Sequence, residues 1–237
     1  MSLVDQEISH ELVFNAPAQV IIPVVGSNAS FPVRRIYCVG RNYVEHIREM
    51  RESDERDPPF FFQKPRDAIV LSGESIFYPS FTEDYQFEVE LVVAIGKRGM
   101  ELTKDQALQH IYGYAVGLDM TRRDRQRESG KKGLPWEIGK SFDFSSPCGD
   151  IHPVDQVGHF RKARISLSMN GALRQDSNIE KMIWSVPEIV SNLSQQYELV
   201  PGDLIYTGTP AGVSSMVSGD KLIGLVEGLK PLDITIK

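Results

Sequence analysis

Two glutamates flank a single valine at Glu88-Val89-Glu90, directly before an apolar run that ends at Ile95. Residues i and i+2 of a strand point to the same face, about 6.6 Å apart along the chain, so both carboxylates can reach one ion. Asp119, at the end of a later strand-like run, can supply a third carboxylate. An all-oxygen ligand set favours Mg²⁺ or Mn²⁺. On spacing alone, an exposed strand face with unrelated charges remains the commoner explanation.

His46 and Glu49 are three residues apart in a charged, helix-prone segment that runs from residue 42 to residue 56. At that spacing two side chains share one face of a helix. A carboxylate can orient an imidazole and raise its basicity, as a general base requires. An ordinary surface ion pair is the alternative, and spacing alone favours it. The narrow apolar stripe of the segment predicts a helix that lies over the surface as a lid.

Lys140 lies in Gly139-Lys140-Ser141, which resembles the end of a phosphate-binding loop. That loop needs a glycine where this chain has Leu134, so the phosphate-binding interpretation fails. Lys140 therefore stays a candidate as a lone cation. The sequence has no GxSxG, HExxH or GxGxxG motif, which argues against a serine hydrolase, a zinc protease or a dinucleotide-binding enzyme.

The elements that would position these residues are mostly short strands. The Asn170-Gly171 pair predicts a tight hairpin of the type I′ kind. Capping signals at Thr103, Thr121 and Ser185 predict three helices, over 103–111, from 121 to about 130, and over 185–197. The predicted fold is one β-rich domain with a few helices after a strand-poor lead-in, and its strands are expected at 35–40, 60–63, 88–95, 112–118, 164–169, 172–174 and 204–207.

Composition narrows the function further. The 237 residues are 41% hydrophobic, which is typical of a globular protein. A net charge of -6 without a long basic run argues against nucleic-acid binding. The charges between Arg122 and Lys132 are expected mostly on a solvated helix face. No apolar stretch is long enough to span a membrane, and no signal peptide or disulfide framework is recognisable, so a cytoplasmic location is expected.

Taken together, the ordered motifs of this chain resemble those of the fumarylacetoacetate hydrolase family. The similarity extends from about Arg35 to Ile236. The motifs that carry it are VGRNYVEHIREM, FFFQKP, FEVELVVAIGK, YAVGLDMTRRD, GLPWEIGKSFD, MNGALRQ and GDLIYTGTPAGV.

This resemblance implies an α+β, β-rich fold, namely a mixed β-roll with a few peripheral helices, assembled as a homodimer. It implies a lead-in segment over 1–34 and a single catalytic domain over 35–237, with a lid helix at about 42–56. It also implies site residues. The metal ligands would be Glu88, Glu90 and Asp119, the catalytic residues His46, Glu49 and Lys140, and the substrate-binding residues Arg41, Lys64, Arg123, Gln126 and Thr209.

The sequence is most similar to the short, single-domain branch that includes acylpyruvate hydrolases. The expected activity is therefore metal-dependent cleavage of a carbon–carbon bond in a 2,4-dioxo acid. Fumarylpyruvate is the favoured substrate, because Arg41, Arg48 and Arg51 suit an anionic acyl group. Decarboxylation or isomerisation of oxaloacetate or of a hydroxy-dienedioate on the same site is the main alternative, and a non-catalytic metal-binding assembly protein is another. Gln86 and Phe87 stand where many short relatives have histidines.

Overall fold

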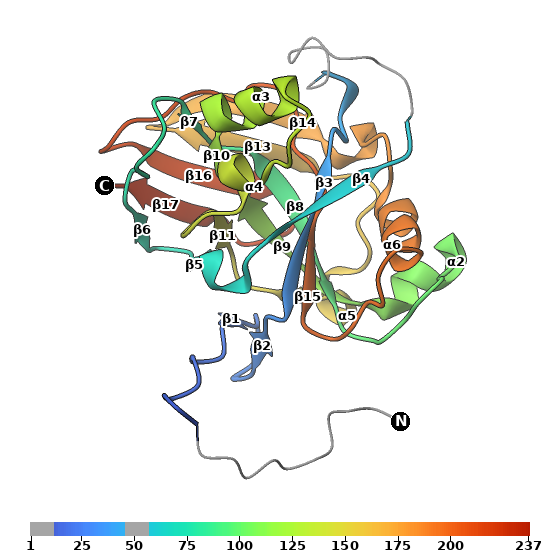
Figure 1. Ribbon diagram of the computed structural model, residues 1–237. Coiled ribbons are helices and arrows are strands. Elements are labelled where there is room, and N and C mark those ends of the chain that lie inside the picture. The colour runs from blue at the N-terminus through green and yellow to red at the C-terminus, as the bar shows by residue number, and fades with distance from the viewer. Residues whose placement is uncertain (1–11, 46–56) are drawn as a thin grey trace.

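The structure is a computed structural model that describes residues 12–45 and 57–237. Its centre is a mixed eight-stranded sheet, in which β8 lies between β15 and β9 (Figure 1). The strand order is β4-β3-β15-β8-β9-β11-β5, and β12 also pairs with β9. The strands of this sheet are β3 (Arg35–Gly40), β4 (Phe60–Lys64), β5 (Ile69–Leu71), β8 (Val89–Ile95), β9 (Ile111–Leu118), β11 (Ser146–Cys148), β12 (His152–Pro153) and β15 (Asp203–Tyr206).

A second sheet has five strands in the order β14-β13-β16-β17-β6 and lies beside the first, at the left of Figure 1. Its strands are β6 (Ser75–Ile76), β13 (Arg164–Met169), β14 (Ala172–Asn178), β16 (Lys221–Val226) and β17 (Leu232–Ile236). The predicted hairpin joins β13 to β14, with φ of 53° at Asn170 and 79° at Gly171. Positive φ at both turn residues confirms the I′ geometry.

The largest hydrophobic core lies where the two sheets meet. Leu91 and Val93 from β8 belong to the same buried cluster as Ile165 and Leu167 from β13. A smaller cluster covers the opposite face of β8, where Val92 and Ala94 pack with side chains of the lead-in. β8 was expected to be half-buried, but all seven of its residues are buried because the lead-in covers that second face.

The lead-in is therefore less strand-poor than expected. It contains the antiparallel pair β1 (Ile21–Pro23) and β2 (Ser30–Pro32). Ile22 and Phe31 alternate with exposed neighbours in these strands, and both enter the smaller core cluster. Alternation over only three residues is too short a pattern to recognise in the sequence.

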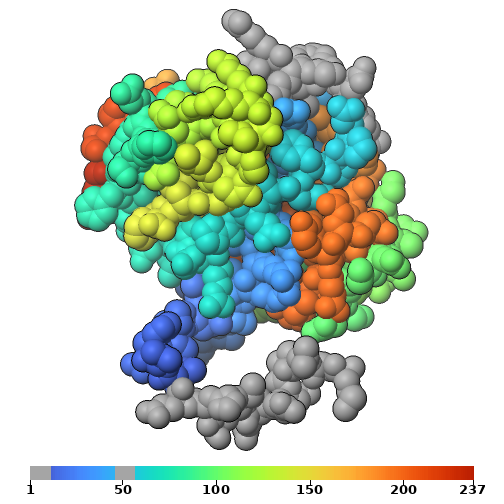
Figure 2. All heavy atoms as spheres, in the orientation of Figure 1, coloured from blue at the N-terminus to red at the C-terminus, as the bar shows by residue number. Residues whose placement is uncertain are grey.

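The helices are short and peripheral. α2 begins after the predicted Thr103–Gln106 capping box, and α6 begins after a second box formed by Ser185 and Glu188. α4 packs against β4 and α3, and the yellow-green atoms of this region lie beside cyan atoms in Figure 2. None of the helices in the described ranges is long and apolar enough to cross a membrane. The helices are α2 (Lys104–Ala107), α3 (Arg123–Lys131), α4 (Glu137–Lys140), α5 (Val154–Val157) and α6 (Val186–Ser194), with short 3-10 turns η1 (Arg66–Ala68), η2 (Leu108–His110) and η3 (Ile179–Lys181).

Candidate metal centre and active site

Three carboxylates meet where β8 begins and β9 ends. Val89 pairs with Leu118 across the two antiparallel strands, so Glu88 and Asp119 lie opposite each other just beyond that pair. The Asp119 N–H donates to the Glu88 carbonyl at 2.9 Å. Glu90 lies on the same side of β8 as Glu88, as a two-residue spacing requires. All three side chains are buried, and one ligand oxygen from each lies within 4.8 Å of the others.

Lys140 is the cation that two of these carboxylates share. Its Nζ donates to Glu88 Oε2 at 2.8 Å, to Asp119 Oδ2 at 2.7 Å and to the Thr121 hydroxyl at 2.7 Å. The side chain is buried because α4 ends against the sheet at this lysine. Burial alone would lower the pKa of Lys140, but Asp119 and Glu88 outweigh it and raise the pKa. Lys140 is therefore a firmly charged ammonium group.

Lys64 approaches the cluster from β4. Its Nζ lies 2.9 Å from Asp119 Oδ1, within ion-pair distance but without a well-directed hydrogen bond to that oxygen. It also donates to the carbonyls of Met120, at 3.1 Å, and of Lys140. Burial lowers the pKa of Lys64, although Asp119 opposes the shift. Asp119 Oδ1 is thus a buried acceptor that is held by an ion pair with Lys64 and keeps lone-pair capacity for a further ligand.

Arg123 neutralises the far side of Glu88. Its guanidinium donates to Glu88 Oε1, to Gln86 Oε1 at 2.8 Å and to Gln126 Oε1 at 2.6 Å. Gln86 therefore aims the arginine at the carboxylate. The segment from Arg122 to Lys132 was expected to form a mostly solvated helix face, but Arg123, Gln126 and Ser129 form the buried face of α3.

Glu90 has a different environment. Within the described residues, its Oε2 accepts a hydrogen bond from the backbone N–H of Gly208 at 2.7 Å. Burial, with the nearby charges of Asp119 and Glu88, raises the pKa of Glu90 well above its ordinary value. Gly208 has φ of +98°, and a Cβ added there would lie 2.6 Å from Asn42 Cβ. Only glycine brings this N–H so close to Glu90 without a clash.

Thr209 stabilises the residue between the two glutamates. Its hydroxyl donates to the Val89 carbonyl at 2.8 Å and accepts from Gln175 Nε2 at 2.9 Å. Gln175 Oε1 in turn accepts from the Val89 N–H at 3.0 Å. Thr209 was expected in the substrate pocket, and the structure places its hydroxyl on the backbone of the ligand-bearing strand.

Arg41 lies at the rim of the site, directly after β3. It is exposed and has φ of 59°, which is the left-handed region that non-glycine residues rarely adopt. Its guanidinium carbon lies 5.5 Å from the Phe60 ring centroid and 5.9 Å from the Trp136 ring centroid. These rings also contact each other edge to face at 5.0 Å. His46 and Glu49, the predicted lid pair, lie outside the described residues.

Three contributors to the site were not recognisable from local sequence patterns. Thr121 was expected to cap a helix, but Arg122 occupies the N-cap position, and the Thr121 hydroxyl instead donates to the Asp119 carbonyl and accepts from Lys140. Asn42 and the Gly208 N–H also escaped notice, because their roles depend on contacts between segments far apart in the chain. Both residues lie in motifs that this chain shares with the fumarylacetoacetate hydrolase family. Their position in these motifs was the one signal in the sequence that pointed to them.

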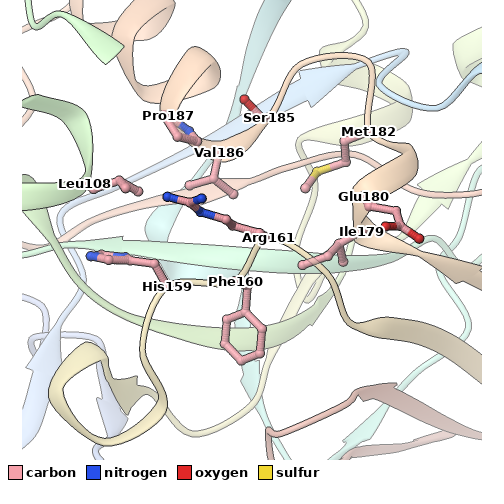
Figure 3. A pocket seen from close by; sticks show the side chains of 10 residues that line it. All are labelled: Leu108, His159, Phe160, Arg161, Ile179, Glu180, Met182, Ser185, Val186 and Pro187. Atoms are coloured by element: carbon pink, nitrogen blue, oxygen red, sulfur yellow. The ribbon is translucent and has the colours of Figure 1, made fainter. Parts of the chain in front are cut away.

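A surface pocket of about 290 Å³ lies elsewhere, between η2, η3 and the start of α6 (Figure 3). None of the predicted site residues lines it. Its side chains are largely apolar, and Arg161 extends across it toward Pro187 and Val186 in Figure 3. The pocket therefore offers no cluster of acids comparable to the carboxylates of the sheet.

The buried triad suits a divalent metal ion. Its donors are oxygens alone, its three acids converge, and Asp119 Oδ1 has no hydrogen bond. Hard ions such as Mg²⁺ and Mn²⁺ prefer such ligands. Each carboxylate oxygen has two lone pairs, so an oxygen that accepts from a lysine or arginine can still bind an ion.

Comparison with known proteins gives concordant matches. The family model for the fumarylacetoacetate (FAA) hydrolase C-terminal domain matches residues 35–236. A fumarylpyruvate hydrolase from Ralstonia sp is 49% identical over 177 residues, covering 75% of this chain and 92% of the relative. The mitochondrial oxaloacetate tautomerase of Homo sapiens is 39% identical over 204 residues, and the match covers 86% of this chain and 92% of the relative.

A solved structure is also very similar. The crystal structure of fumarylpyruvate hydrolase from Pseudomonas aeruginosa, in complex with Mn²⁺ and pyruvate, superposes with a TM-score of 0.93 at 51% identity. The match covers 95% of this chain and 99% of that one. The chain therefore belongs to the fumarylacetoacetate hydrolase family.

Proposed function

We propose that this protein is a metal-dependent hydrolase that cleaves a carbon–carbon bond in an acylpyruvate, with fumarylpyruvate as the favoured substrate. The observation that carries the proposal is the buried triad Glu88, Glu90 and Asp119 with its ring of cations. It occurs in a chain that is 51% identical to a fumarylpyruvate hydrolase solved with Mn²⁺ and pyruvate.

The charges of the site match such a substrate. Three carboxylates face three cations, Lys64, Lys140 and Arg123, so the ionised cluster sums to about zero. A bound Mg²⁺ or Mn²⁺ would add two positive charges and act as a Lewis acid that polarises a 2-oxo acid. An acylpyruvate whose carboxylate is ionised and whose cleavage releases an enolate presents two negative charges to balance them.

The side chains divide the work of the reaction. We assign His46, oriented by Glu49, as the general base that takes a proton from water as the water attacks the 4-oxo carbon. The bond between that carbon and the neighbouring CH₂ then breaks, so the acyl group leaves as a carboxylic acid and the remainder leaves as pyruvate enolate. A proton added to the enolate carbon gives pyruvate, and one water is consumed.

Lys140 and the arginines bind the anionic parts of the substrate. The charged ammonium of Lys140 can stabilise a developing oxyanion through its positive charge, since its three N–H bonds already donate to Glu88, Asp119 and Thr121. Arg123 forms an ion pair with Glu88. In this assignment Gln126, which accepts a hydrogen bond from Arg123, contacts the oxo acid. Arg41, beside Phe60 and Trp136 at the rim, suits the second carboxylate of a fumaryl group. In this assignment Lys64 stabilises the Asp119 carboxylate, and Thr209 stabilises the strand between the glutamates.

A substrate panel tests the proposal. Acylpyruvates with neutral and anionic acyl groups, including fumarylpyruvate, are incubated with the protein in Mg²⁺, in Mn²⁺ and in EDTA. We expect loss of the enol absorbance together with equimolar pyruvate and fumarate, and no turnover in EDTA. Turnover that persists after complete metal removal, or absence of pyruvate from every acylpyruvate, would refute the assignment.

Oxaloacetate chemistry is the second candidate, because an oxaloacetate tautomerase is 39% identical to this chain. Keto–enol exchange or decarboxylation of oxaloacetate needs a held 2-oxo acid and a stabilised enolate, but no activated water. The same panel separates the two functions. Enol exchange or release of CO₂ from oxaloacetate, without acylpyruvate cleavage, would favour the second candidate.

Four further expectations belong to this proposal. They are a homodimer, Mg²⁺ as the native ion, a cytoplasmic location and a role in the breakdown of aromatic compounds. The homodimer is supported by the family resemblance, and light scattering of the purified protein tests it directly. A mass of 26.6 kDa in solution would contradict the dimer, whereas twice that mass is expected.

A further inference from the structure

Tyr43 has a hydroxyl group that the proposed mechanism does not use. The side chain is 1% exposed, and its hydroxyl is buried without a hydrogen-bond partner. Buried hydroxyls are normally paired, because an unpaired one has lost its bonds to water. Among the tyrosines that the structure describes, only Tyr43 and Tyr85 have such a hydroxyl.

The backbone around Tyr43 is held rigidly by its neighbour Asn42. The Asn42 amide donates to the carbonyls of Thr207, at 2.8 Å, and Trp184, at 3.0 Å, and accepts from the Trp184 N–H at 2.7 Å. The Asn42 carbonyl accepts from the Ile183 N–H at 2.8 Å. Tyr43 itself pairs with Met182 in an isolated bridge.

Through Asn42, the chain segment that carries Tyr43 packs against the loop that contacts Glu90. Asn42 packs against Gly208, whose N–H donates to Glu90. Burial, and next the charge of Glu90, raises the pKa of Tyr43, so the hydroxyl stays protonated and can donate. The pKa of Tyr85 is also raised by burial, but the charged groups that act on it are Arg122 and Tyr78 rather than the acidic triad.

Among the described residues, no cation contacts Glu90 directly, although Lys140 acts on its pKa from a distance. Glu88 and Asp119 contact Arg123, Lys140 and Lys64, whereas the hydrogen bond to Glu90 comes from a backbone N–H. An anionic ligand oxygen on that side of the centre needs a donor. The Tyr43 hydroxyl, which feels the charge of Glu90, is a buried donor without a hydrogen-bond partner.

We propose that Tyr43 is a substrate-binding residue whose hydroxyl donates to an anionic oxygen of the 2-oxo acid on the Glu90 side of the metal centre. The inference rests on the proposed function, since it takes a 2-oxo acid as the ligand. It adds a specific contact that distinguishes a 2-oxo acid from a ligand without an oxygen at that position.

Tyr43→Phe tests the contact, and Tyr85→Phe is the matched control. Each change removes one buried, unpaired hydroxyl and retains the ring. Pyruvate binding to the Mn²⁺-loaded proteins is measured by calorimetry, with Mn²⁺ affinity and thermal melting measured beside it. For Tyr43→Phe we expect the Kd of pyruvate to rise about tenfold. We expect Mn²⁺ affinity to be unchanged and the melting temperature to be no lower than that of wild type.

For Tyr85→Phe we expect no change in pyruvate or Mn²⁺ affinity. The inference is overturned if the Kd of pyruvate for Tyr43→Phe is within twofold of the wild-type value, or if Tyr85→Phe weakens pyruvate binding by the same factor as Tyr43→Phe. It is also overturned if the wild-type protein does not bind pyruvate. A fall in the melting temperature of Tyr43→Phe would show that the hydroxyl stabilises the fold and would also overturn it.

The binding assay separates this inference from the proposed function. If wild type binds pyruvate in the expected Tyr43-dependent way but cleaves no acylpyruvate, the proposed function fails and the contact stands. If wild type cleaves acylpyruvates while Tyr43→Phe binds pyruvate normally, only the contact fails. For an active wild type, we further expect kcat/KM of Tyr43→Phe to fall about tenfold.

Discussion

The acidic cluster has two halves with opposite electrostatics. Glu88 and Asp119 are surrounded by Arg123, Lys140 and Lys64, which contact all four of their carboxylate oxygens. Glu90 receives a backbone N–H, and its pKa is raised by burial and by the other two acids. Glu88 and Asp119 are therefore ion-paired by the protein itself, whereas Glu90 has no directly contacting cation among the described residues.

The difference shows how a buried triad can be stable without metal and still bind one. A cluster in which every acid is directly ion-paired would attract an ion weakly, and one in which no acid is paired would destabilise the fold, because buried charges need partners. Concentrating the unpaired charge on Glu90 gives both properties. The predictions below test this division, from the largest expected effect to the smallest.

His46→Ala tests whether proton transfer can be lost while metal binding by both halves of the acidic cluster is retained. We expect turnover of an acylpyruvate to fall by about 10²–10⁴-fold, the usual contribution of a general base. Mn²⁺ affinity should be unchanged, because neither half of the cluster is altered. Steady-state kinetics and a metal titration on one preparation check this. Wild-type turnover would remove His46 from the mechanism, and weakened metal binding would place it at the cluster instead.

Lys140→Ala removes the cation that the neutralised half shares. Without metal, two buried carboxylates lose a partner, and the free energy of unfolding should fall by about 3–5 kcal/mol. Saturating Mn²⁺ should reduce this difference, because the ion replaces the lost charge. Urea unfolding in EDTA and in Mn²⁺ gives both values.

The control for that variant is Lys162→Ala, whose side chain is 72% exposed and 3.5 Å from Glu180. Surface ion pairs contribute little, so its unfolding should match wild type. If Lys140→Ala were equally stable in EDTA, Lys140 would not neutralise the cluster.

Glu90→Gln tests the half without cations. We expect Mn²⁺ affinity to fall at least about tenfold, which corresponds to roughly 1.4 kcal/mol. The metal-free protein should be as stable as wild type or more so at neutral pH, since the change removes a buried charge that lacks a cation. Calorimetric titration measures the Mn²⁺ affinity, and unfolding in EDTA measures the metal-free stability. Glu83→Gln, at an exposed position, is the control for both. A large loss of metal-free stability would mean that Glu90 is already well neutralised.

The pH dependence of Mn²⁺ binding gives the smallest and most graded effect. A carboxyl group must lose its proton to bind the ion, and the pKa of Glu90 is raised well above the ordinary value of 4.5. Affinity should therefore fall as pH falls, beginning well above pH 4.5, and rise again as pH rises. Glu90→Gln should flatten that dependence. A wild-type affinity that stays constant down to pH 5 would contradict the raised pKa.

Local patterns in the sequence predicted much of this fold. The Asn170-Gly171 turn and the Thr103 capping box follow from nearest-neighbour chemistry, and both are confirmed. The convergence of Glu88, Glu90 and Asp119 is confirmed as well, although spacing alone left it open. It required the pairing of β8 with β9, which the sequence did not predict, whereas the family resemblance implied the three ligands directly.

Contacts between distant segments could not be read from the sequence. Thr121 looked like a helix cap, since nothing nearby indicated that Lys140 would reach its hydroxyl. The Gly208 N–H became a partner of Glu90 only through folding. Arg123 was expected at the substrate, and its observed contact with Glu88 depends on the orienting amide of Gln86, 37 residues away. The roles of His46 and Glu49 stay predictions.

The neutralised half of the cluster has a consequence for how the protein acquires its ion. Because Lys140, Lys64 and Arg123 already form ion pairs with Glu88 and Asp119, we expect the chain to complete its fold before any metal arrives. We expect the ion to exchange reversibly with the surrounding pool, so that relative supply decides between magnesium and manganese. A protein stripped by chelation would then be refilled without refolding, and the identity of its metal would follow the physiology of the cell.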